Sequence, residues 1–314
     1  MRSSPRTYFV QAALHILWVG LLGLAVACSG KPVRVAAWPI PAVGPGQLLA
    51  YVPAGAQLLV EIDVARLRAN PVVGALVRRF VDAATPVTPG VPLPPGLPTS
   101  LRGVDAIVIA SFMVGAADAQ TLTLLRVDPT HHVAGVGVGA GVVAVGPENL
   151  IAQALLLGNA PSGAARGHQL SAALVAARQR IALPGTDGSA LRITATLSTA
   201  AAAALGVPPT LAVWSDVVDD AAILISCPRA SVDALAQRLR QFEQNTVLRL
   251  LGLAPSLAQL RVQHNAPWAR IIVVIAPGPL RRAVQRASAT LGTTVDSPGM
   301  PVQNVPQSSQ GAVP

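Results

Sequence analysis

One pattern occurs three times in this chain: an apolar stretch, then a proline, then a stretch with the apolar spacing of a helix. The copies begin with GVVAV, AAILISC and IIVVIA, and they span residues 141–158, 221–239 and 271–287. Proline is tolerated at a helix start, because the first N–H groups of a helix have no partner within it. Each copy is therefore predicted to be a strand followed by a helix.

A further strand is predicted close before each copy, at Thr121–Val127, Leu211–Val217 and Leu257–Gln263. The unit is then strand, strand, helix, which is typical of an α+β fold with a largely antiparallel sheet and helices on one face. Another strand, Ala190–Leu197, leads into the helical stretch STAAAAALG. Similar units in both parts of the chain indicate two related halves, with a boundary near residues 160–187.

The sequence also predicts secondary structure at the start of the first half. Gln57–Ile62 is predicted to be a strand, Asp63 to cap a short helix, and Asn70-Pro71 to start another. The residues that share one face of that second helix are Val73, Leu76, Val77 and Phe80. Further predictions are a hairpin of Ala106–Val114 with Thr121–Val127, and a helix capped by Ser231 with a stripe of Val232, Leu235, Leu239 and Phe242.

The chain divides into segments of different composition. Residues 28–46 are rich in Pro and Gly and predict an extended tether, and residues 85–100 hold six prolines and predict a surface loop. The tail from residue 293 has no apolar periodicity, which predicts disorder. We expect a signal peptide at 1–27, the tether at 28–46, the first half at 47–160, the second half at 187–292 and the tail at 293–314.

The composition supports a folded core and argues against a nucleic-acid partner. Of the 314 residues, 52% are hydrophobic and 12% charged, which is ample for a buried core. The net charge is +9, and Lys31 is the only lysine among the 23 basic residues. The arginines are scattered in ones and twos without interleaved aromatic residues, so solvated helix faces are favoured over a polyanion site.

The amino-terminal segment has the order of a secretory signal. Residues 1–11 carry Arg2 and Arg6 and no acid, and residues 12–27 are almost wholly apolar. A helix of 16 residues rises about 24 Å, which is short of the roughly 30 Å hydrocarbon core of a bilayer. A removed signal is therefore favoured over a membrane-spanning anchor, which stays the weaker alternative.

The residues Ala25-Val26-Ala27-Cys28 resemble the lipobox of bacterial lipoproteins, in which small residues precede a cysteine at the end of the apolar run. The resemblance implies cleavage after Ala27, diacylglycerol on the Cys28 sulfur and acylation of the new amino terminus. It departs from the family pattern at Ala25, where leucine is usual. An ordinary secretory signal with an incidental thiol at Cys28 is the alternative. The segment from residue 57 to the Asn-Pro helix is also similar to uncharacterised bacterial envelope proteins.

No catalytic motif stands out in the chain. The run GVGVGAG at 135–141 matches a dinucleotide pattern on paper, but a strand is predicted to follow it where a helix is needed, so a strand or turn is favoured. The nearest approach to a metal site is Asp128 with His131 and His132, which His168 and His264 could join only if the fold brought them together. Adjacent histidines on a strand point to opposite faces, so a loop is favoured and no metal or cofactor is expected.

The densest acidic group is Asp216, Asp219 and Asp220. Such carboxylates can act as acid and base or bind calcium, but Asp219-Asp220 fits a hairpin turn. Glu61 and Asp63 alternate with apolar residues, which predicts one charged and one buried strand face. Cys227 lies at the end of an apolar run and is interpreted as a small buried side chain, since a catalytic thiol needs a nearby histidine.

These patterns support two functional hypotheses. The first is a lipid-anchored protein of the cell envelope, facing the periplasm or the cell surface, whose body binds or scaffolds an envelope protein or polymer without catalysis. The lipid on Cys28 is expected to attach this protein to the membrane, which is its first partner. Ser29 stands where aspartate marks inner-membrane retention in some bacteria, which favours the outer membrane. The alternative is an envelope hydrolase with a site around Asp216–Asp220.

Overall fold

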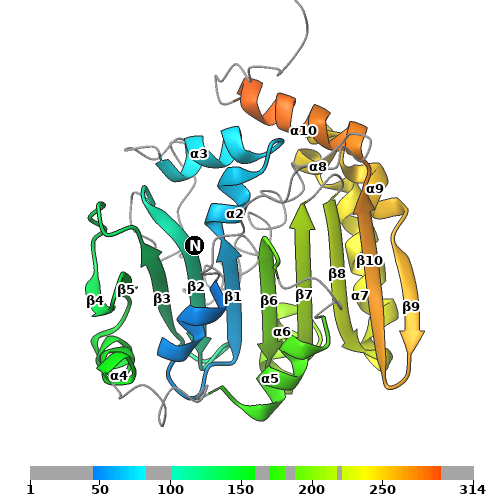
Figure 1. The fold of residues 1–314 in the computed structure, drawn as a ribbon. Helices are drawn as coiled ribbons and strands as arrows, with labels where there is room; N and C mark the ends of the chain where they lie inside the picture. Colours follow the sequence, from blue (N-terminus) through cyan, green and yellow to red (C-terminus); the bar gives the residue numbers. More distant parts are fainter. Residues whose placement is uncertain (1–44, 83–100, 160–169, 182–187, 218–220, 291–314) are drawn as a thin grey trace, which may run out of the picture.

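A computed structural model describes residues 45–82, 101–159, 170–181, 188–217 and 221–290, which form one ten-stranded antiparallel sheet with helices against it (Figure 1). The strands are β1 Leu58–Asp63, β2 Val104–Phe112, β3 Gln120–Val127, β4 Val136–Gly139, β5 Val142–Val145, β6 Leu191–Thr196, β7 Thr210–Val217, β8 Ala221–Pro228, β9 Arg261–Asn265 and β10 Trp268–Ile275. The α-helices are α2 Val64–Ala69, α3 Gly74–Asp82, α4 Glu148–Asn159, α5 Ala172–Gln179, α6 Thr199–Leu205, α7 Val232–Gln241, α8 Thr246–Leu251, α9 Ala254–Ala258 and α10 Pro277–Thr290. The 3-10 helices are η1 Pro45–Tyr51, η2 Arg229–Ser231 and η3 Phe242–Gln244.

The strand order follows the same plan on both sides of the centre. The order across the sheet is β4-β5-β3-β2-β1-β6-β7-β8-β10-β9. Counted outwards from the central pair, the first half runs β1, β2, β3, β5, β4 and the second half runs β6, β7, β8, β10, β9. The two series correspond strand by strand. The two halves meet where β1 pairs with β6, with Val60 opposite Ile193.

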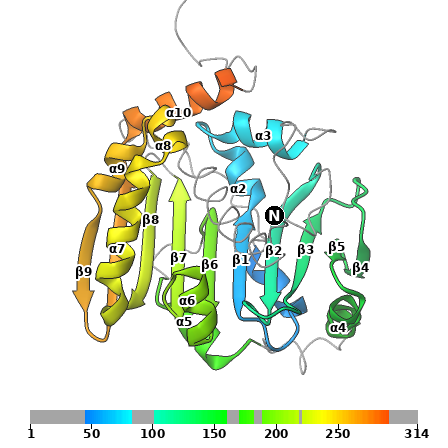
Figure 2. The ribbon, with the colours of Figure 1, turned by 180° about the vertical axis from the view of Figure 1, so that it is seen from behind.

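Each face of the sheet carries its own core, because side chains alternate along every strand. On the first face, Val60, Ile107 and Ile223 pack in one cluster with Val64 of α2 and Leu280 of α10. Helices α3, α7, α8 and α9 cover this face too, and α7 lies behind the strands in Figure 1 and in front of them in Figure 2.

The second face is covered mainly over the first half. Leu59, Val108 and Leu124 pack there with η1, α4 and α5. A small cluster over the second half joins Ile181, just after α5, to Trp214 and its neighbours on β7 and β8. In Figure 1 this face points toward the viewer, with η1 and α5 in front of the strands.

The α+β class, the antiparallel sheet and the three strand–proline–helix units are confirmed: β5 leads to α4, β8 to α7 and β10 to α10. The helices, expected on one face, cover both. The difference arises at α4, whose Leu150 and Ala154 pack with Val142 and Ala144 on the second face, whereas α7 and α10 pack on the first.

Local details were predicted with mixed success. Asp63 caps α2 by accepting the N–H of Arg66, as expected, and Ser198 caps α6 in the same way. Ser231, predicted as a cap, makes no capping hydrogen bond with its side chain, because it lies in η2 with αR angles, whereas a capping residue is extended. The strand predicted at Leu257–Gln263 is right only in its last three residues, because α9 runs from Ala254 to Ala258 with Pro255 in its first turn and β9 begins at Arg261.

Several expectations concern residues outside those that the structure describes: the signal at 1–27, the tether up to residue 44, the loop at 85–100 and the tail at 293–314. Across the described ranges, every helix is too short or too polar to cross a membrane.

Candidate functional site

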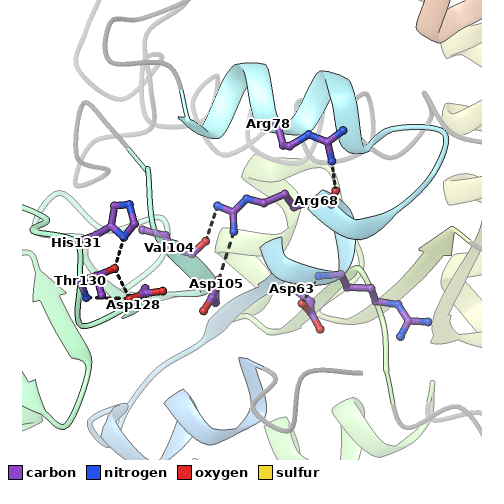
Figure 3. A network of polar contacts seen from close by, with 9 residues as sticks. Asp63, Arg68, Arg78, Val104, Asp105, Asp128, Thr130 and His131 are labelled. Carbon is purple, nitrogen blue, oxygen red and sulfur yellow. Dashed lines mark hydrogen bonds and ion pairs between the residues drawn. The ribbon is translucent and has the colours of Figure 1, made fainter. Parts of the chain in front are cut away.

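An open polar depression of ≈ 490 Å³ lies where β2 begins, beside the end of α2 and the loop after β3 (Figure 3). The residues that line it are Arg68, Arg102, Gly103, Asp105, Asp128 and His131. Two arginines, two carboxylates and one imidazole therefore face the same space. This mixture of charges can contact a polar ligand by hydrogen bonds and ion pairs.

Arg68 forms the wall of the depression on the α2 side. Its Nη1 lies 3.3 Å from Asp105 Oδ1, and its Nη2 donates to the carbonyl oxygen of Val104 at 3.1 Å. Arg78 of α3 donates to the carbonyl oxygen of Arg68 at 2.8 Å, which ties the end of α2 to the next helix. Arg68 is thus held in place by protein contacts on both its side chain and its backbone (Figure 3).

The opposite wall is a short polar turn after β3. Asp128 Oδ1 accepts hydrogen bonds from the Thr130 N–H at 2.8 Å and from the Thr130 hydroxyl at 2.6 Å, and these bonds lower the pKa of Asp128. His131 Nδ1 lies 3.0 Å from the same hydroxyl oxygen. This is the local bonding that aspartate and threonine make in turns. The hydroxyl proton is directed to the carboxylate, so the three groups do not form an activated nucleophile.

A glycine brings the two walls together. Gly103 has a φ of +75°, and a Cβ added to it would come within 2.4 Å of the His131 ring. The Asp128 N–H donates to the Gly103 carbonyl oxygen at 2.8 Å. The loop can therefore lie against the start of β2 only because residue 103 has no side chain.

A second polar cluster, buried at the centre of the sheet, was missed at the sequence level. Glu61 is 2% exposed, and Arg178 of α5 donates to it through Nε at 2.7 Å and Nη2 at 2.9 Å. Arg192 of β6 stands directly opposite Glu61, and burial lowers its pKa in spite of the attraction of Glu61. The expectation of a charged strand face at Glu61 and Asp63 is wrong, because β1 is the central strand and is covered on both sides.

Asp216, one of the candidate catalytic acids, belongs to a similar arrangement. It is 5% exposed, and the side chain of Arg66 contacts both of its oxygens, with Nε 2.8 Å from Oδ1. That hydrogen bonding raises the pKa of Arg66. Burial also raises the pKa of Asp63, against the lowering by the N–H and the charge of Arg66. No signal in the sequence links Arg66 to a residue 150 positions later.

The other sequence candidates are not brought together. Asp219, Asp220, His168 and Cys28 lie outside the described residues, and His264 lies on β9 at the far edge of the sheet from His131. Within the described ranges, no group of three or more histidine, cysteine, aspartate or glutamate residues could hold a metal ion. The glycine run forms β4 and its turn into β5, as the strand interpretation predicted. Cys227 is buried on the first face, as expected, and burial raises its pKa to about 11.

Comparison with known proteins gives little to add to this geometry. No protein-family model matches the chain, and no curated protein matches it. A solved structure described as crystal form I of TP0453 is similar with a TM-score of 0.33 and 10% identity, over 80% of this chain and 99% of that one. A likeness at this level carries no argument about function.

Proposed function

We propose that this chain is a lipid-anchored cell-envelope protein whose α+β body binds a partner without catalysing a reaction. The anchoring part rests on the order of Arg2 and Arg6, the apolar residues 12–27, and Ala25-Val26-Ala27 before Cys28. One acyl chain holds a protein to a bilayer only marginally, so several chains on Cys28 would give a stable attachment.

The observation that carries the non-catalytic part is the state of the buried carboxylates. Asp216 is bound by Arg66, Glu61 by Arg178, and Asp63 caps a helix, so all three serve the fold. A general acid or base has to reach a substrate proton, which a buried and fully paired carboxylate does poorly. The hydrolase alternative therefore draws no support from Asp216.

The attachment is tested by growing cells with a radioactive fatty acid and recovering the protein. Label is expected in the wild type and in Cys227→Ala, the matched control for loss of a cysteine, and is expected to vanish in Cys28→Ala. Equal label in Cys28→Ala, or no label in the wild type, would overturn the proposal.

The proposed location is the outer membrane, on the ground that Ser29 follows the cysteine where some bacteria use aspartate to retain a lipoprotein in the inner membrane. Separation of the two membranes on a density gradient tests this. The chain should sediment with the outer membrane, and Ser29→Asp should move part of it to the inner one. Recovery of the wild type in the inner membrane would contradict the assignment.

A further inference from the structure

The second face of the sheet is not covered evenly by the described helices. Over the second half, α5 reaches β6 and β7, and the outer strands β8, β10 and β9 carry no described helix on that face (Figure 1). Cross-strand pairing places Leu224 opposite Ile272 and Ala222 opposite Val274. We call the following residues the docking face: Ala222, Leu224, Trp268, Ile272 and Val274, with Arg261 and Arg270.

The docking face exposes apolar surface that a sheet in a soluble core would bury. Val274 is 46% exposed, although its neighbours on β10, Val273 and Ile275, are buried on the first face. Leu224 and Ile272 are half-buried, in contrast to Ile223 and Ile271, which point the other way. Contiguous apolar surface of this kind marks a contact with another molecule or a membrane.

The charged side chains of the docking face, Arg261 and Arg270, are both positive. Arg261 is exposed and stands opposite Ile272 in the ladder, and Arg270 is half-buried one step along. Arg180 lies over the Trp268 ring, 3.6 Å from its centroid, and accepts at its carbonyl oxygen from Arg270 at 3.1 Å. The seven residues of the docking face include no acid. The acidic side chains that β1 and β7 place elsewhere on the second face, Glu61, Asp63 and Asp216, are buried, and Glu61 and Asp216 are paired with Arg178 and Arg66. A face of this composition suits a partner that is both anionic and apolar.

The chain enters the body on the same face. Helix η1 begins at Pro45 and packs on the second face through Leu48 and Leu49. Residues 29–44 span at most about 55 Å when fully extended. If Cys28 is acylated, as the proposed function requires, the bilayer is within reach of this face.

We propose that the docking face lies against the anionic phospholipid surface of the membrane that holds Cys28. Its aliphatic side chains and Trp268 contact the boundary between headgroups and acyl chains, where tryptophan is enriched, and its arginines pair with lipid phosphates. A second copy of the chain is a poorer occupant, because self-pairing would bring the arginines of two faces together without an acid between them.

The test places a fluorophore that brightens in apolar surroundings on Val274→Cys of the full-length lipoprotein, mixed with preformed vesicles. The labelled peptide is identified by mass, since Cys227 is buried. Emission should increase and shift to the blue on vesicles rich in phosphatidylglycerol and change little on phosphatidylcholine alone. The matched control is Leu250→Cys, an apolar residue that is 67% exposed on α8, a helix of the first face.

Charge removal then measures the contribution of the arginines. Each of Arg261→Gln and Arg270→Gln should lower the ratio of docked to undocked protein about fivefold on the anionic vesicles, and high salt should reduce it too. Equal signals on the two lipids, no effect of either arginine, or the same signal from Leu250→Cys would overturn the proposal. A Val274→Cys signal that rises with protein concentration without vesicles would instead identify a second copy as the occupant.

The mass of the Cys28 peptide from the same sample separates this inference from the proposed function. Acylated Cys28 without a response at position 274 overturns the docking face and leaves the anchor standing. A response at position 274 with unmodified Cys28 overturns the lipid anchor and leaves the docking face standing.

Discussion

Arg178 and Glu61 lie 117 residues apart in the chain and are joined by two hydrogen bonds at the middle of the sheet. The pair fastens α5 onto β1, next to the line where the two halves meet. Arg192 adds a second positive charge beside the same carboxylate. The carboxylate of Glu61 thus balances the charges of two arginines. Removing the acid and removing one arginine should therefore lower the stability by different amounts.

Glu61→Leu is expected to lower the free energy of unfolding by roughly 3–5 kcal/mol, because it leaves two partly buried arginines without a carboxylate. Arg178→Leu should cost about half as much by the same reasoning, since Glu61 still faces Arg192. Urea denaturation with unchanged slope measures both. Glu61→Leu/Arg192→Leu should recover part of the loss, and equal losses for the two single variants would contradict this account.

Asp63 should make the protein less stable as the pH rises. Burial raises its pKa above the ordinary 3.8, so the folded state holds the proton more tightly than the unfolded state. The contribution of Asp63 is therefore most favourable below 3.8 and declines as the pH rises through the raised pKa. Asp63→Asn keeps a good capping residue and removes the titration.

The urea midpoint of Asp63→Asn, taken relative to that of the wild type, should accordingly rise between acid and neutral pH. Asp118→Asn, in the exposed turn between β2 and β3, serves as the control and should follow the wild type. A difference between Asp63→Asn and the wild type that falls as the pH rises would mean that the cap favours the charged form.

The Cys227 thiol should react slowly with a disulfide reagent in the folded protein. It is buried, and the rise of its pKa from 9.0 to about 11 leaves about 100-fold less thiolate at mildly alkaline pH. Absorbance of the released thiol follows the reaction, and urea above the unfolding midpoint should restore an ordinary rate. Fast labelling of the native protein at Cys227 would contradict the described burial.

The two helix-start serines provide a matched pair. Ser198→Ala should cost about 1 kcal/mol, because its hydroxyl accepts the Ala201 N–H at 3.1 Å. Ser231→Ala removes a hydroxyl that makes no capping bond at α7 and should change the unfolding free energy by less than about 0.5 kcal/mol. Thermal or urea unfolding of the two variants side by side tests the difference, which an equal loss would refute.

The sequence reveals interactions that are local and conceals those that are not. Asp63 was predicted as a cap because it bonds an N–H three residues ahead. Ser198 makes the same kind of local bond but was not singled out as a cap. The repeated strand–proline–helix units were likewise visible in the spacing of apolar residues. The ion pairs of Glu61 and Asp216 depend on partners that only the sheet order brings close. From the sequence, Glu61 was therefore interpreted as part of a charged strand face and Asp216 as a candidate catalytic acid. For the depression at Asp128, the sequence indicated the loop that holds Asp128 and His131, because these residues are neighbours in the chain. It did not indicate Arg68, which comes from another element.

The position of β1 decides how the body would bear a mechanical load. A force on the chain ahead of Pro45 passes through η1 to a central strand, paired on one side with β2 and on the other with β6. Pulling it out requires breaking hydrogen bonds to both neighbours, whereas an edge strand can peel from one. A tether attached here would pull on a strand that is hydrogen-bonded on both sides. The same strand is joined to α5 by the ion pair of Glu61 with Arg178.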